Sequence, residues 1–179
     1  MLKSIIIAGA GGQGNIFAGE VFAVAVLKEN KNVTFYPSYG PQMRGGKSTC
    51  TVVISDEEIG SPIVNTPDVL IVMNEPSFDF IKNVRRDGLV IINSSLTKYH
   101  DCGERKDLRI INVNTAPILE KLNSPKVSNM ILLGVYLKAT GIVSMENTLA
   151  ALKEKLEEEG KGKFLEINRQ ALMVGYNLF

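Results

Sequence analysis

The chain has 179 residues, of which 45% are hydrophobic and 22% charged, so it can bury a sizeable core as one domain spanning residues 1–179. Its formal charge of +1 indicates no basic surface for nucleic acid or for an acidic membrane. Two cysteines and one histidine exclude a disulfide framework, a four-cysteine iron–sulfur site and most zinc or triad chemistry. The first apolar run is too short for a signal peptide or a membrane span, so we expect a cytoplasmic protein with reduced thiols.

The first part of the chain predicts a strand, a glycine turn, a helix and a second strand. Residues 2–8 form a short run rich in isoleucine, which is typical of a buried parallel strand. Residues 15–28 place apolar residues at helical spacing, and residues 31–36 predict the next strand. This order is that of the first half of a doubly wound sheet.

The next segment, residues 37–48, has two prolines and three glycines and predicts a loop. Residues 48–55 alternate in polarity, which indicates an antiparallel edge strand or a hairpin. The remaining chain predicts three further buried strands, a short helix in the middle and helices towards the C-terminus. These elements are the strands 68–73, 88–93 and 109–113, the helix 78–86, the helices 128–140 and 144–160, and a final two-heptad stripe of Phe164, Ile167, Ala171, Val174 and Leu178.

These elements predict an α/β fold: a Rossmann-like, mostly parallel sheet with an antiparallel edge element and a helical C-terminal region. The final stripe would pack either on the body of the protein or on a partner. Of the residues with reactive side chains, His100 is expected at the surface, Cys50 as a core filler and Cys102 as an exposed loop thiol. Ser94 and Ser95 follow a strand and either contact a ligand or cap the next segment.

The segment from Gly9 to Gly14 satisfies G-x-G-x-x-G between a strand and a helix. Such glycines permit a tight turn and let an anion approach the backbone N–H groups of the helix N-terminus. Residues 35–38, at the end of the second strand, offer no carboxylate for a ribose. Dinucleotide binding, another phosphate-bearing ligand and a tight turn without a ligand remain open. Gln13 offers donors and an acceptor either to a polar ligand or to a neighbouring loop.

A second glycine-rich segment carries the arginine Arg44 beside Gly45 and Gly46. Arginine presents a planar fork to phosphate or carboxylate, and the glycines leave room for a ligand or a second subunit. The alternative is an ion pair with one of the chain's own carboxylates. Because both loops follow the carboxyl ends of strands, we expect them to converge on one crevice.

Several strings together resemble the gamma subunit of the 2-oxoacid:ferredoxin oxidoreductases. They are GAGGQGNIFAGEVFA, YPSYGPQMRGGKSTCTVVISDEEIGSPIV, PDVLIVMNEPSFDF and GLVIINSSL. The likeness covers residues 5–96, and the helical tail fits in length and character. The resemblance implies a heteromeric enzyme that oxidatively decarboxylates a 2-oxoacid, joins the acyl group to coenzyme A and passes electrons to ferredoxin.

The same resemblance implies that the chain works with alpha, beta and ferredoxin-like delta subunits and is not catalytic alone. Thiamine diphosphate, Mg²⁺ and the iron–sulfur clusters would belong to those partners, and no catalytic or metal-binding residue is assigned to this chain. The resemblance assigns coenzyme A or subunit contacts to the loop residues Gly11, Gly12, Gln13, Gly14, Tyr39, Arg44, Gly45 and Gly46.

The strings fit a 2-oxoglutarate or branched-chain 2-oxoacid enzyme better than a pyruvate enzyme, and Tyr39 stands where the indolepyruvate branch tends to have histidine. An isolated gamma subunit would expose an apolar patch, through which it could form a homodimer. Two other readings remain: a stand-alone nucleotide-binding module with a G-x-G-x-x-G loop, and an assembly subunit whose glycine loop binds nothing.

Overall fold

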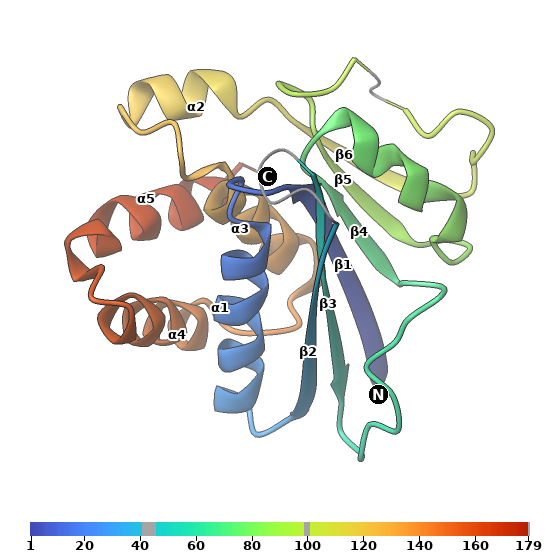
Figure 1. Ribbon diagram of the computed structural model, residues 1–179, viewed down its shortest axis with the longest axis horizontal. Helices are drawn as coiled ribbons and strands as arrows, with labels where there is room; N and C mark the ends of the chain where they lie inside the picture. Colours follow the sequence, from blue (N-terminus) through green and yellow to red (C-terminus); the bar gives the residue numbers. More distant parts are fainter. Residues whose placement is uncertain (41–45, 99–100, 179) are drawn as a thin grey trace.

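A computed structural model describes residues 1–40, 46–98 and 101–178, and these residues build a six-stranded sheet in the order β2-β3-β1-β4-β5-β6 (Figure 1). Strands β1, β4, β5 and β6 are parallel, whereas β3 is antiparallel to both of its neighbours. The predicted Rossmann-like α/β class is therefore confirmed. The strands are β1 (Leu2–Ala10), β2 (Asn32–Tyr39), β3 (Lys47–Ser55), β4 (Val69–Val72), β5 (Leu89–Asn93) and β6 (Arg109–Val113).

The antiparallel element is a hairpin of β2 and β3, and β2 is the strand at the edge. β3 separates β2 from β1, because all but two of its residues are buried and it therefore fits the inside of the sheet. The pairing continues to Tyr39 opposite Ser48, so the loop predicted for residues 37–48 is shorter than expected. Pro37 is accommodated within β2 because an edge strand can leave one side unpaired.

The helices cover the sheet unequally. In Figure 1, α1, α3, α4 and α5 lie on one face, while η1 and residues 101–108 lie on the other face. The larger core fills the space under the helices, where the rings of Phe22 and Tyr136 meet edge to face at 5.0 Å. The helical segments are α1 (Asn15–Lys28), η1 (Glu75–Asn83), α2 (Ala116–Lys121), α3 (Ser128–Thr140), α4 (Met145–Glu158), η2 (Gly162–Phe164) and α5 (Leu165–Tyr176).

The middle helix differs from its prediction, since residues 75–83 form a 3-10 helix instead of an α-helix over 78–86. Its end is fixed by Arg105, whose guanidinium donates to the backbone carbonyls of Ile81 at 3.1 Å and Val84 at 2.8 Å. The same guanidinium donates to the Asp107 carboxylate at 2.8 Å. These contacts take up carbonyls that a longer helix would use.

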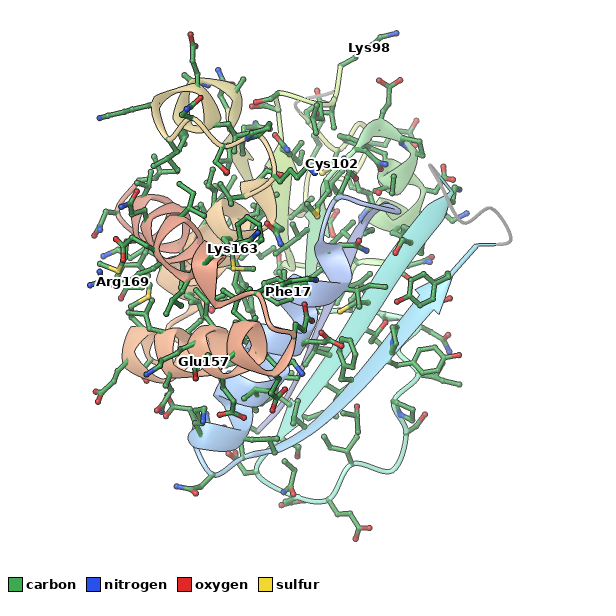
Figure 2. All side chains as sticks on the ribbon, turned by 60° about the vertical axis from the view of Figure 1, so that its left-hand side comes forward. Phe17, Lys98, Cys102, Glu157, Lys163 and Arg169 are labelled. Atoms are coloured by element: carbon green, nitrogen blue, oxygen red, sulfur yellow. The ribbon has the colours of Figure 1, made fainter. Side chains whose placement is uncertain are left out.

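One other expectation is corrected. Cys102 is buried, because it packs into the smaller core beneath η1, whereas Cys50 lies in the larger core as expected. The C-terminal stripe packs on the body in part: Ala171 is buried and Ile167 lies against the larger core, whereas the end residues Phe164 and Leu178 are exposed. The short helix α2 was not predicted. Figure 2 shows α4 and α5 as the outer helical layer.

Candidate ligand-binding site

The glycine loop between β1 and α1 has a backbone that only glycine adopts readily. Gly12 has φ 94° and Gly14 has φ 74°, both in the left-handed region. Helix α1 begins without a side-chain cap and with no acidic residue in its first turn. The free N–H groups and the positive end of the helix dipole make this turn suitable for an anion.

Gln13 holds the glycine loop in place. Its Oε1 accepts a hydrogen bond from the Ala10 N–H at 2.7 Å, and its Nε2 donates to the Met73 carbonyl at 3.4 Å. A Cβ on Gly9 would lie 2.8 Å from Gln13 Oε1, so this neighbour must also be small. Of the two roles left open for Gln13, the structure shows the tie to a neighbouring strand.

The second glycine-rich segment meets the glycine loop. The Gly11 N–H donates to the Gly46 carbonyl at 3.1 Å, which confirms the predicted convergence for the described end of this segment. Tyr39 ends β2 with 70% of its surface exposed. Arg44 and Gly45 lie outside the described residues, so their predicted contacts stay predictions.

Asn15, the first residue of α1, links the glycine loop to the end of the second glycine-rich segment. Its side-chain Nδ2 donates to the Ser48 carbonyl at 2.8 Å and to the Ser48 hydroxyl at 3.2 Å. Lys47 beside it pairs with Asp79 of η1, and the hydrogen bond from Lys47 lowers the pKa of that carboxyl. The start of β3 is therefore attached both to α1 and to η1. Sequence reasoning missed Asn15, although an asparagine directly after the glycine loop was a usable signal.

Polar side chains also gather where β5 and β6 end. The Ser95 hydroxyl accepts from the Ala116 N–H at 2.9 Å and donates to Asn114 at 2.8 Å, so Ser95 contacts the start of the distant helix α2 and not the segment that directly follows it. The Thr115 hydroxyl donates to Asn93 Oδ1 at 2.9 Å. The Nδ2 of Asn93 is buried without a partner among the described residues.

A second unpaired amide group lies beside the glycine loop. Asn129, near the start of α3, donates from Nδ2 to the Gly14 carbonyl at 3.0 Å, while its Oδ1 is buried without a described partner. A Cβ on Gly14 would lie 2.6 Å from that Nδ2. The only sequence signal for Asn129 was an asparagine within an otherwise apolar helix, and it was not used. Buried polar groups without partners are uncommon in proteins and mark places where a further polar group fits.

The topology argues against a classical dinucleotide site. In that site the strand carrying the ribose-binding acid lies next to β1, at the end of the first strand–helix–strand unit. Here β3 occupies that position and runs in the opposite direction. β2, the strand after α1, ends in Pro37, Ser38 and Tyr39, with no carboxylate.

Comparison with known proteins identifies the family. Residues 4–178 match the family model described as pyruvate ferredoxin/flavodoxin oxidoreductase. The chain belongs to this family. Among curated proteins, it is 38% identical over 170 residues to the ketoisovalerate oxidoreductase subunit VorA of Methanothermobacter marburgensis, covering 94% of this chain and 35% of that one. It is 34% identical over 184 residues to the 2-oxoglutarate synthase subunit KorC of the same organism, covering 98% and 99% of the two chains.

Solved members of the family share the fold. The gamma subunit of a keto/oxoacid ferredoxin oxidoreductase from Geobacter sulfurreducens superposes with a TM-score of 0.81 at 28% identity, over 97% of this chain and 96% of that one. The 2-oxoglutarate:ferredoxin oxidoreductase from Magnetococcus marinus was solved with 2-oxoglutarate, coenzyme A and succinyl-CoA bound. It superposes with a TM-score of 0.85 at 19% identity, over 97% of this chain and 30% of that one. This family domain therefore occurs both as nearly a whole chain and as about a third of a longer one.

The described residues show no group of three or more His, Cys, Asp or Glu side chains arranged to hold a metal ion. Within the same residues, no helix has the length and apolar character needed to cross a membrane.

Proposed function

We propose that this chain is the gamma subunit of a 2-oxoacid:ferredoxin oxidoreductase and that it helps to bind coenzyme A. In this proposal the whole complex converts a 2-oxoacid, coenzyme A and oxidised ferredoxin to acyl-CoA, carbon dioxide and reduced ferredoxin. A 2-oxoglutarate or branched-chain 2-oxoacid is the preferred substrate. The complex is cytoplasmic and includes alpha, beta and ferredoxin-like delta subunits, and the isolated chain could form a homodimer.

The observation that carries the proposal is the junction of the two glycine-rich segments at the uncapped start of α1. The hydrogen bond from the Gly11 N–H to the Gly46 carbonyl joins both segments at the carboxyl end of β1. Gly12 and Gly14 present backbone there without a Cβ. Coenzyme A carries phosphate groups, which such a turn binds well. The Magnetococcus relative, which has the same fold, holds coenzyme A.

Within this site the residues have different roles. Gly11, Gly12, Gly14, Gly45 and Gly46 would let the ligand approach the backbone closely, and Arg44 would pair with a phosphate. Tyr39 supplies an exposed aromatic surface at the mouth of the loop. Gln13 acts as a positioning residue, since both ends of its amide already bind within the chain.

The chain's own residues do not fit an iron–sulfur cluster. Cys50 and Cys102 are buried in cores on opposite faces of the sheet, so they cannot reach one cluster together. In this proposal the clusters belong to the partner subunits, and the family resemblance assigns thiamine diphosphate and Mg²⁺ to those subunits as well. In the proposed complex this chain binds and orients coenzyme A, and the redox chemistry occurs elsewhere.

The test is Arg44→Ala in the complex reconstituted with its partner subunits. Loss of a charge-assisted hydrogen bond costs about 1.5–3 kcal/mol. We therefore expect the KM for coenzyme A to rise roughly tenfold to a hundredfold, with kcat at saturating coenzyme A and subunit assembly unchanged. The matched control is Arg169→Ala, which removes an exposed arginine on α5 (Figure 2). An unchanged KM for coenzyme A in Arg44→Ala would contradict the binding role and leave a structural one.

A further inference from the structure

A cavity lies at the amino ends of the parallel strands, whereas the glycine loop lies at their carboxyl ends. It is a cavity of about 570 Å³ at the amino ends of β1, β4 and β5, closed on one side by the end of α3. Its walls come from Lys3 and Ser4 of β1, Lys31 after α1, residues 85–89 before and in β5, and Tyr136 with residues 140–142. The volume is in the range of sites that bind small molecules.

Positive charge is concentrated at this cavity. Lys3, Lys31, Arg85 and Arg86 line it, against the carboxylates of Asp68 and Asp87, while the N-terminal ammonium of the lining residue Met1 is balanced by its ion pair with Asp56. The whole chain has a net charge of only +1, so an excess of two positive charges at one cavity is a local feature of the fold.

Asp68 organises part of this charge. Its carboxylate accepts hydrogen bonds from the Ser4 N–H at 2.8 Å, the Ser4 hydroxyl at 3.0 Å and Arg85 Nη1 at 2.5 Å. Lys3 Nζ lies 3.5 Å away. The Asp68 side chain is only 14% exposed, so this group is part of the wall of the cavity and fixes two of the cations in place.

The other two cations lack such partners. Among the described residues, neither Lys31 nor Arg86 forms an ion pair within 4.0 Å, although the charge of Lys31 lowers the pKa of Glu29 and Asp56 and that of Arg86 lowers the pKa of Asp107 from a greater distance. The cavity therefore presents two paired and two unpaired cations. An anion that enters it meets more positive than negative charge and leaves the existing Asp68 contacts intact.

The remaining wall is apolar. Val69, Leu89, Tyr136 and Ile142 line the cavity beside the cations, and Tyr136 is only 2% exposed because its ring packs on Phe22. An apolar wall with a few converging charged groups is the usual composition of a small-molecule site. It fits a ligand that has one anionic end and a less polar body.

We propose that this cavity binds a small organic phosphate. A phosphate group carries up to two negative charges, which matches the excess of two cations, and arginine binds phosphate oxygens through its planar fork. The proposal is independent of coenzyme A binding, because the cavity lies at the amino ends of the strands, the glycine loop lies at the carboxyl end of β1, and the two share no residue.

The test is a titration of the ¹⁵N-labelled full chain with inorganic pyrophosphate, followed by amide chemical shifts in a phosphate-free buffer. We expect saturable shifts at Gly88 and Gly141, which line the cavity. The double variant Lys31→Gln/Arg86→Gln is expected to weaken this binding at least tenfold. Both side chains are partly or fully exposed, so the variant is expected to fold.

The control is Lys163→Gln/Arg169→Gln, which removes the same two charges from the outer helical layer (Figure 2). It is expected to change the affinity less than twofold. Equal weakening in both double variants would overturn the proposal, because only general charge attraction would then be acting. Shifts confined to Gly11 and Gly12, or no saturable shift at all, would also overturn it. A phosphate site at the glycine loop is tested separately by Arg44→Ala, so the two proposals can fail independently.

Discussion

Both cysteine thiols are held in the protonated form by their surroundings. Burial, with a smaller contribution from the Glu20 carboxylate, raises the pKa of Cys50 to about 12. Burial also raises the pKa of Cys102, and the Asp101 carboxylate acts in the same direction. Since the thiolate is the reactive form, both residues are expected to be inert in the folded protein.

We predict that neither thiol reacts readily with a disulfide reagent at pH 8. An ordinary thiol with a pKa of about 8.5 is partly ionised there, so Cys50 should react about a thousandfold more slowly than in the unfolded chain. Two thiols should be released on unfolding in guanidinium, which serves as the control. A thiol that reacts quickly in the native protein, and is lost in Cys102→Ser, would show that Cys102 is accessible.

At the scale of elements, α3 and α5 pack with their backbones in close contact. A Cβ on Gly134 would lie 2.2 Å from the Leu172 carbonyl, and a Cβ on Gly175 would lie 2.0 Å from the Ile131 carbonyl. Backbone atoms cannot move aside as a flexible side chain can. The two helices would have to separate to admit a methyl group.

Gly134→Ala is therefore predicted to destabilise the protein by about 1–3 kcal/mol, the usual cost of overpacking, although alanine favours helix by about 1 kcal/mol over glycine. Urea unfolding of the free chain measures the change. Gly162→Ala is the matched control, because nothing lies within 4 Å of a Cβ there, and its stability should stay within about 0.5 kcal/mol of the wild type. A neutral Gly134→Ala would show that the helices can separate at no cost.

Elements that depend on local pattern were predictable from sequence, and those that depend on distant contacts were not. The isoleucine run of β1 and the glycines before α1 carry their signals within a few residues. The burial of α5 depends on its crossing with Gly134, so the regular spacing from Phe164 to Leu178 did not show that both of these end residues are exposed. The place of β3 between β2 and β1 likewise depends on pairing between separate strands.

The same limit applied to the candidate site. The glycine loop was identified from its residues, and its meeting with the second segment followed from strand direction. The supporting contacts of Asn15 and Asn129 were missed, because Ser48 and Gly14, their partners, are far from them in sequence.

At the scale of the whole molecule, different interactions stabilise the two ends of the parallel strands. The carboxyl end of the parallel strands is held by neutral hydrogen bonds, such as those from Gly11 and Asn15, and by the exposed, solvent-screened ion pair of Lys47 and Asp79. At the amino end, the exposed Asp56 pairs with the N-terminal ammonium, and the largely buried Asp68 joins β1, the start of β4 and the turn before β5. Because Asp68 is the least exposed of these carboxylates, acid should weaken the amino end first.

The sign follows from the pKa of Asp68. Burial raises it, but hydrogen bonds from Arg85 and Ser4 and the charge of Lys3 lower it further, so the pKa in the folded protein is below the usual value. A lowered pKa stabilises the fold above the unfolded value of about 3.9, and this stabilisation is lost as pH falls through the folded pKa.

We predict that Asp68→Asn costs about 2 kcal/mol at pH 7 and that its difference from the wild type shrinks below about pH 4. Urea unfolding at pH 7 and at pH 3 measures both. Asp79→Asn, which removes an exposed and solvent-screened partner of Lys47, should show a much smaller dependence on pH. If the free energies of unfolding of Asp68→Asn and the wild type differ by the same amount at both pH values, the charge of Asp68 does not stabilise the amino end of the strands.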